Sequence, residues 1–264
     1  MFEHFKDLNL QTKSKSLVLG RRLYTVEYRQ QNFWLKLQLQ DSHSMGSRVG
    51  FEQELNFYRK MKGSADFVLP VQLIEVKDSF TEKLYPWGIL LPHADLYFNH
   101  SVSGLTLNKI KQYIASALLT LGKLHASGLI HGDLKTEHFV QYQNNVYLID
   151  FEQCQEVNSM DSTEMTATPH YMAPELFHGE QKTIQSDLYA LGVILFEWLT
   201  QQRLSASNYT QWAILHCQQF QIELPTDLQY FSPLLKGLLS KHRNARFNDV
   251  NQALNVLNST KLSI

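Results

Sequence analysis

Cysteine is nearly absent from this sequence, which has two cysteines among 264 residues. Cys154 and Cys217 cannot build a disulfide framework, and nothing pairs them into metal-ligand spacing. A reducing compartment such as the cytoplasm is therefore the expected location. Long apolar runs are missing as well, since the longest, YALGVILFEWL at 189–199, has 11 residues and contains Glu197. This run is too short to cross a bilayer, so it predicts a buried helix and no membrane span.

A charge excess of either sign is also lacking. The chain carries 24 Lys and Arg against 25 Asp and Glu, so no overall field steers it toward nucleic acid, and we expect no nucleic-acid partner. The balance is uneven, because residues 1–92 carry 13 basic and 10 acidic side chains and the remainder carries 11 and 15. This mild split favours an anionic ligand near the first part of the chain.

The first third of the sequence has the composition of a sheet. Residues 17–39 are rich in β-branched and aromatic side chains and are interrupted at Gly20 and at 30–32, which predicts three antiparallel strands. Residues 48–62 place apolar side chains at helical spacing. Two further short strands are expected near 67–76 and 86–92.

The period of the apolar pattern then changes. Residues 105–128 carry one apolar stripe at helical spacing, and Gly128 is a suitable residue to end this helix. We therefore predict an α+β protein with a bilobal arrangement. A small β-rich lobe at 1–92, with five strands and one helix, and a larger helical lobe at 93–264 together form one domain.

The chemistry is concentrated in the stretch HGDLKTEH at 131–138. It places Asp133 two residues before Lys135, and a second carboxylate, Asp150, follows 17 residues after Asp133 at the end of an apolar segment. Phosphoryl transfer needs one carboxylate to orient a hydroxyl, another to hold Mg²⁺, and cations to neutralise the moving phosphoryl group. These residues predict that chemistry.

Several motifs in this order resemble the protein kinase superfamily over almost the whole chain. HGDLKTEH resembles the catalytic loop, DFE at 150–152 the metal-binding D-F-G, and TATPHYMAPE at 166–175 the end of an activation segment. The chain is most similar in pattern to eukaryotic-like (Hanks-type) serine/threonine kinases of bacteria. The resemblance implies a kinase fold, ATP and Mg²⁺ as cofactors, and a protein or peptide substrate that carries serine or threonine.

The resemblance also implies roles for individual residues. Asp133 would orient the substrate hydroxyl and accept its proton, while Lys135 would screen the γ-phosphate. Asp150 would hold Mg²⁺ through its oxygens. Lys36 would bind the α- and β-phosphates, with Glu54, 18 residues further on, as its partner in preference to Glu52, because Leu55 follows Glu54 as the family pattern requires.

Other family positions are implied to support the loop and the substrate. Thr168 would contact the catalytic aspartate and lysine and mark serine/threonine specificity. His131 would hold the catalytic loop in shape, and Asp187 would connect its helix to that loop. Glu175 and Arg246 would form a structural ion pair.

The chain departs from the family pattern where a glycine-rich loop is expected. LVLGRRLY at 17–24 offers Gly20 alone, followed by two arginines. Backbone amides need small neighbours to approach phosphates closely, so the usual phosphate cradle must be altered. A guanidinium forks onto phosphate oxygens, and we expect Arg21 or Arg22 to take over part of this role.

Three further departures concern the metal and the regulation. His138 occupies the place of a metal-binding asparagine, and an imidazole ligand suits Mn²⁺ better than Mg²⁺, so Mn²⁺ is an alternative cation. Glu152 replaces a glycine and either joins the metal shell or faces solvent. Gly132 replaces the arginine that reads a phosphate on the activation segment, so we expect activity that does not require this phosphate.

These departures leave two other functions open. His138, Glu152 and the glycine-poor hairpin are partially similar to the bacterial kinases of lipopolysaccharide core sugars, which favours a small-molecule kinase. The altered loop also allows a pseudokinase that binds nucleotide or a partner protein without transfer. The set of Lys36, Glu54, Asp133, Lys135 and Asp150 favours an active enzyme.

Overall fold

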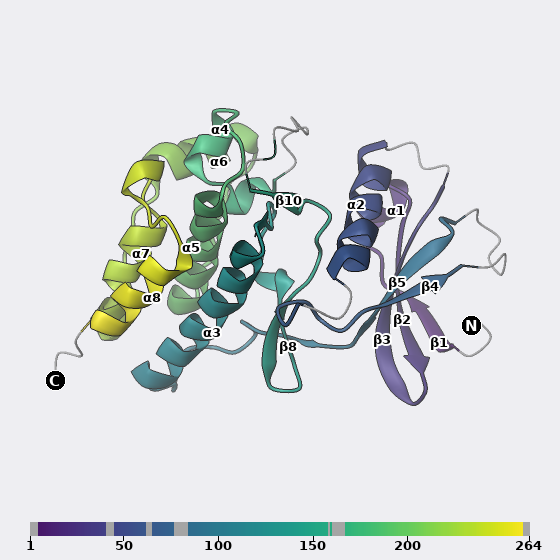
Figure 1. Cartoon of the computed structure of the whole chain (residues 1–264). Coiled ribbons are helices and arrows are strands. Elements are labelled where there is room, and N and C mark those ends of the chain that lie inside the picture. Colours follow the sequence, from purple (N-terminus) through teal and green to yellow (C-terminus); the bar gives the residue numbers. More distant parts are fainter. Residues whose placement is uncertain are drawn as a thin grey trace. The chain divides into compact units, whose positions relative to one another are not determined.

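The computed structural model of the chain describes residues 5–40, 45–61, 65–76, 84–157, 159 and 167–260 (Figure 1). The chain forms two compact units. The first consists of Met1–Asp95 together with Tyr142–Glu152, and the second of Leu96–Gln141 together with Gln153–Ile264. The segment 142–152, which carries Asp150, therefore belongs to the first unit although it lies far along the sequence.

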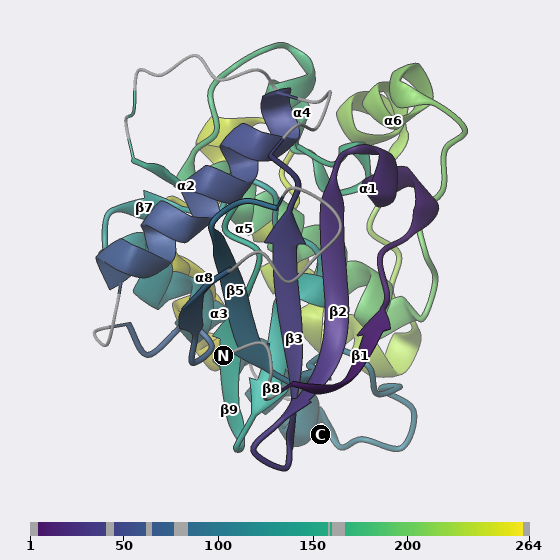
Figure 2. The ribbon, with the colours of Figure 1, turned by 90° about the vertical axis from the view of Figure 1, so that its right-hand side faces the viewer.

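The first unit is built on an antiparallel sheet of five strands in the order β1-β2-β3-β5-β4 (Figure 2). Alternation along β3 buries Phe33, Leu35 and Leu37, which join the core of this unit, and leaves Lys36 on the other face. The register of β2 and β3 places Leu23 opposite Lys36. The strands are β1 (Lys6–Leu10), β2 (Arg21–Tyr28), β3 (Gln31–Gln38), β4 (Gln72–Glu75), β5 (Trp87–Pro92) and β9 (Asn145–Leu148), the last outside this sheet.

The prediction of three strands within 17–39 is wrong. The region contains two strands, β2 and β3, and it is preceded by the short helix α1 (Ser14–Val18). The remaining strand at this edge is β1, which pairs with β2. All five β1 residues are exposed, so this edge strand lacks the buried apolar face that marks the other strands of the sheet.

Helix α2 (Met45–Met61) is the long helix of the first unit (Figure 2). The predicted apolar stripe buries Phe51, Leu55 and Tyr58, each 1% exposed. Glu54 lies on the same side of the helix and is equally buried. A carboxylate buried to this extent needs a cationic partner, and Lys36 supplies it.

The second unit is mainly helical. Helix α3 (Leu107–Ala126) begins after Thr106, whose side chain accepts a hydrogen bond from the Lys109 backbone, and it buries its predicted stripe. Helix α5 (Ile184–Thr200) is buried on nearly all sides, as its apolar run predicts. The prediction of an α+β protein with a β-rich first part and a helical second part is confirmed.

The second unit also contains a set of shorter elements. No helix in the described ranges is long and apolar enough to span a membrane. The short strands of this unit are β6 (Asp95–Leu96), which straddles the boundary, β7 (Leu129–Ile130), β8 (Phe139–Tyr142) and β10 (Gln155–Glu156). Its remaining α-helices are α4 (Pro174–Phe177), α6 (Tyr209–Ile214), α7 (Ser232–Leu238) and α8 (Val250–Ser259). Its short 3₁₀ helices are η2 (Thr136–His138), η3 (Pro169–Tyr171), η5 (Thr226–Phe231) and η6 (Arg243–Ala245), and η4 (Leu215–Gln219) is a π-helix.

Candidate functional site

Lys36 is the centre of a charged cluster in the first unit. Its Nζ lies 2.6 Å from Oε2 of Glu54, the partner predicted from the sequence. The same nitrogen lies 2.9 Å from Oδ1 of Asp150 and 2.7 Å from Oε1 of Glu152. One ammonium group therefore joins strand β3, helix α2 and the segment after β9.

Burial and charge act in opposite directions on this cluster. Burial alone would lower the pKa of Lys36, but the carboxylates of Asp150, Glu152 and Glu54 raise this pKa well above its ordinary value. Burial raises the pKa of Glu54 to about 7 although Lys36 lowers it, and the neighbouring Asp150 adds to the rise. Lys36 is therefore a permanent cation among crowded carboxylates.

The segment that carries Asp150 is anchored to helix α2 through Phe151. The Phe151 ring is fully buried and stacks on Phe57 with 3.9 Å between ring centroids. The Phe151 backbone N donates to Oε1 of Glu54 at 3.2 Å. Asp150 itself has φ of 65°, a left-handed conformation that aspartate tolerates better than most residues. The packing of one aromatic ring thus sets the direction of the carboxylates on either side of it.

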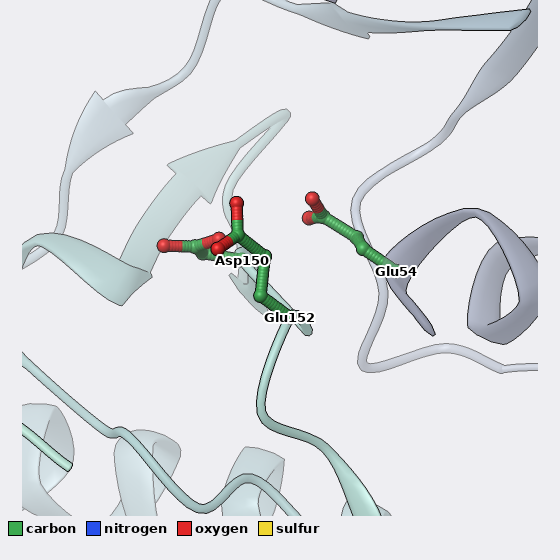
Figure 3. Close-up of side chains that lie close together, drawn as sticks. All are labelled: Glu54, Asp150 and Glu152. Atoms are coloured by element: carbon green, nitrogen blue, oxygen red, sulfur yellow. The ribbon is translucent and has the colours of Figure 1, made fainter. Parts of the chain in front are cut away.

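Glu54, Asp150 and Glu152 form a carboxylate group of the kind that holds a divalent metal ion, and the ammonium of Lys36 contacts all three of them. Each offers a carboxylate oxygen, these oxygens lie within 4.8 Å of one another, and the carboxyl group of Glu54 faces those of the other two (Figure 3). Carboxylate oxygens are the hard ligands that Mg²⁺ and Mn²⁺ prefer. Glu152 is 6% exposed, so the alternative that it faces solvent is wrong.

The two arginines after Gly20 have different partners. Arg21 forms an ion pair with Oε2 of Glu152, whereas Arg22 donates to the backbone oxygens of Leu17 and Arg21. Gly20 has φ of 78°, and its N donates to the Leu17 oxygen at 3.0 Å, which ends helix α1. Arg21 is therefore the arginine of this pair whose side chain joins the Lys36 cluster.

The second unit carries the other predicted catalytic residues. Oδ2 of Asp133 lies 2.9 Å from Nζ of Lys135, and Oδ1 accepts a hydrogen bond of 2.8 Å from the backbone N of Thr168. Both oxygens of this carboxylate are thus oriented by named donors. Residues 167–175 of the TATPHYMAPE stretch are described, whereas Thr166 lies outside the described residues.

Asp187 orients the chain just before Asp133. It is buried in α5 and accepts hydrogen bonds from the backbone N of His131 at 2.8 Å and of Gly132 at 3.0 Å. The His125 ring lies 3.0 Å from the same carboxylate. Although burial would raise the pKa of Asp187, the hydrogen bond and charge of His125 lower it, so the carboxylate stays ionised.

The two histidines of the catalytic-loop stretch pack against each other. His131 is fully buried, His138 is 4% exposed, and their rings stack at 5.2 Å. The carboxylate group that fits a metal does not include His138. A metal-binding role for His138 therefore stays a prediction.

Lys182 and Gln153 line the backbone at Gly132, a feature that the sequence pattern does not reveal. Gly132 has φ of 78°, and a Cβ at this position would lie 2.4 Å from the Gln153 oxygen and 3.1 Å from Cδ of Lys182. Lys182 is 8% exposed and donates to Oε1 of Gln153 at 3.2 Å. Burial lowers its pKa, although the charges of Asp133 and Asp187 oppose this shift. These neighbours leave no room for a side chain at 132.

Glu175 and Arg246 meet as a buried pair with two hydrogen bonds, of 2.7 and 2.9 Å. Arg246 also donates to the backbone oxygens of Gln185 and Ser240, so its guanidinium binds three residues in all. The predicted pair thus lies within the core of the second unit.

The chain carries a strand lysine paired with a helix glutamate, a D-F-x aspartate and a D-x-K loop. This combination is typical of proteins that transfer phosphoryl groups. The model of the protein kinase domain family matches residues 35–258, and the chain belongs to this family. The comparisons favour neither lipopolysaccharide core kinases nor a pseudokinase.

Relatives from several kingdoms are similar to the chain. It is 28% identical to the serine/threonine-protein kinase TIO of Arabidopsis thaliana over 86% of this chain and 17% of that protein. It is 33% identical to the serine/threonine-protein kinase YPK2/YKR2 of Saccharomyces cerevisiae over 48% of this chain and 20% of the relative. It is 36% identical to the probable serine/threonine-protein kinase PknB of Lactococcus lactis over 34% of this chain and 15% of the relative. The chain thus spans a fifth or less of the length of these three relatives.

Proposed function

We propose that this chain is an ATP-dependent serine/threonine protein kinase. The observation that carries the proposal is the contact of Lys36 Nζ with both Glu54 and Asp150, at 2.6 and 2.9 Å. This arrangement offers a cation to polyphosphate oxygens and a carboxylate to the metal that accompanies them. Family membership and the names of the serine/threonine kinase relatives support the same reaction class.

The first unit binds the nucleotide in this proposal. Lys36 donates to the α- and β-phosphates, Glu54 holds Lys36 in place, and Arg21 beside Gly20 adds a second cation. Asp150 is the main ligand of Mg²⁺, with Mn²⁺ as the alternative cation and His138 as a predicted further ligand. The bound metal neutralises phosphate charge and orients the γ-phosphate.

The second unit acts on the substrate. Asp133 accepts a hydrogen bond from the seryl or threonyl hydroxyl of a protein or peptide, and the position of its carboxylate is supported by Lys135 and the Thr168 backbone. The hydroxyl oxygen forms a bond to the γ-phosphorus while the bond to the β–γ bridging oxygen breaks. ADP leaves, the hydroxyl proton passes to Asp133, and Lys135 neutralises charge on the transferred group.

A phosphotransfer assay with Asp133→Ala tests this assignment. Labelled ATP and a serine/threonine peptide panel are incubated with the wild type, with D133A and with D227A, in parallel with Mg²⁺ and Mn²⁺. Asp227 is an exposed aspartate in the same unit and serves as the matched control. We expect D133A to lose at least about 100-fold in rate, with nucleotide affinity retained, since general-base catalysis contributes about that factor. Full activity of D133A would refute the role of this carboxylate.

The cellular setting is a separate part of the proposal. The low cysteine content supports a cytoplasmic location. The motif pattern supports a bacterial source, while the relatives named above come from a plant, a yeast and a bacterium. Activity that does not require an activation-segment phosphate follows from Gly132, which offers no side chain to bind one.

A further inference from the structure

Glu152 connects the two cations that the proposed function assigns to the nucleotide phosphates. Its Oε1 lies 2.7 Å from Nζ of Lys36, and its Oε2 pairs with Nη2 of Arg21. We propose that Glu152 is an internal competitor of the nucleotide, whose carboxylate takes the place of phosphate oxygens between Lys36 and Arg21. This inference rests on the proposed function and adds how nucleotide entry is controlled.

The chemistry of the two groups supports the competition. A carboxylate and a phosphate both present two neighbouring oxygens, so both bridge a lysine and an arginine through charge-assisted hydrogen bonds. Glu152 is 6% exposed, and each of its two carboxylate oxygens lies within ion-pair distance of one of these cations. A nucleotide phosphate gains access to Lys36 and Arg21 once this carboxylate moves away.

The position of Glu152 is confined by its surroundings. Phe151 is anchored in the core, which restricts the backbone before Glu152. On another side, helix α2 approaches closely at Gly50, where a Cβ would lie 3.2 Å from Oε2 of Glu152. The competitor is therefore held at the cations by packing as well as by charge.

Charge balance connects the competition to the metal. The cluster of Lys36, Arg21, Glu54, Asp150 and Glu152 holds three carboxyl groups against two cations, so its cations are already balanced when a polyphosphate enters it. A divalent cation is attracted by the carboxylates, whose oxygens lie within 4.8 Å of one another. With a divalent cation held by these carboxylates, Glu152 would turn away from Lys36 and Arg21, which would then be available to the phosphates. Nucleotide binding then depends on the metal through Glu152.

The test is the nucleotide affinity of Glu152→Gln with and without metal. The dissociation constant of ATP is measured by calorimetry in EDTA and in excess MgCl₂ for the wild type, E152Q and E152D. Glu75→Gln, which removes an exposed carboxylate of strand β4 in the same unit, is the matched control for net charge. We expect E152Q to bind ATP at least about ten-fold more tightly than the wild type in EDTA, and the gain caused by MgCl₂ to become smaller. E75Q should behave as the wild type.

The second variant separates bridging from charge. Asp is one methylene shorter than Glu, so E152D keeps the charge but cannot reach both cations from the same backbone position. We expect E152D to bind ATP more tightly than the wild type in EDTA, and this variant also keeps the test available where E152Q does not fold. Unchanged or weaker ATP binding by E152Q or E152D in EDTA overturns the inference. If the variants fail this test while the wild type still binds ATP tightly in MgCl₂, the proposed function stands. A wild type that binds no ATP in MgCl₂ refutes both the inference and the proposed function.

Discussion

Arg246 forms a two-point ion pair with Glu175, a residue 71 positions earlier in the chain. The side chains are 0% and 5% exposed, so neither charge has water as an alternative partner. The guanidinium also binds the backbone oxygens of Gln185 and Ser240. This pair joins the end of the activation-segment motif to the C-terminal helices of the second unit.

Loss of the arginine is expected to be costly. Arg246→Met leaves Glu175 buried without its cation, and we expect the free energy of unfolding to fall by about 3–5 kcal/mol. Arg243→Met is the control, because Arg243 pairs with Glu180 at the surface, where the side chains are 38% and 50% exposed. Such a pair contributes less than about 1 kcal/mol. Urea unfolding of the two variants checks the difference, and equal losses would contradict it.

The backbone at Gly132 gives a second prediction. Gly132→Ala forces a Cβ to within 2.4 Å of the Gln153 oxygen and imposes a left-handed conformation on alanine. Gly128→Ala carries the same φ of 78° but meets nothing within 4 Å. We expect about 1 kcal/mol of destabilisation for G128A, from conformation alone, and at least about 2 kcal/mol more for G132A. Similar melting temperatures for the two variants would show that the contact of the new Cβ at 132 adds no destabilisation.

His216 makes the stability of the second unit depend on pH. Its ring is buried, Nδ1 lies 2.9 Å from the Tyr189 hydroxyl, and Nε2 donates to the His170 oxygen at 3.1 Å. Burial lowers the pKa of His216 to about 4, from an ordinary value of 6.5. The unfolded chain therefore binds the extra proton first as the pH falls. The stabilisation is fully present above pH 6.5 and decreases between pH 6.5 and pH 4, by up to about 3 kcal/mol.

Comparison with His216→Gln isolates this contribution. The glutamine amide has no proton to gain in this range, so H216Q should show a shallower loss of stability between pH 6.5 and pH 4 than the wild type. Urea unfolding at pH 7, 6, 5 and 4.5 provides the measurement. Parallel pH profiles for the two proteins would rule out His216 as the source of the effect.

The sequence predicted the helices in which the apolar pattern along the chain matches the burial of the side chains in the fold. The stripe of α3 keeps one helical period over many residues, and the run of α5 is almost continuously apolar, so the burial of both helices follows directly. The contact between Lys36 and Glu54 was expected because a strand lysine and a buried helix acid occur at a family spacing. Edge strand β1 escaped prediction because its residues are all exposed.

The contacts that were missed depend on three-dimensional packing. The turn between β2 and β3 uses Arg29 and Gln30 with φ of 51° and 63°, residues that carry no glycine or asparagine signal for such a turn. The pairing of Arg21 with Glu152 spans 131 positions, and no periodicity connects residues so far apart. Lys182 likewise meets Gln153 only after the chain has folded.

The most direct test of the central claim is phosphoamino-acid analysis after reaction of the wild type and Lys36→Met with labelled ATP and a mixed serine, threonine and tyrosine peptide library. Lys36→Met removes the cation that contacts Glu54 and Asp150 and retains most of the side-chain volume. The account predicts label on serine and threonine from the wild type, with at least about 100-fold less from K36M, because charge stabilisation at the phosphates is lost. A wild type that labels no serine or threonine with Mg²⁺ or Mn²⁺, or a K36M variant that labels them equally well, would contradict it.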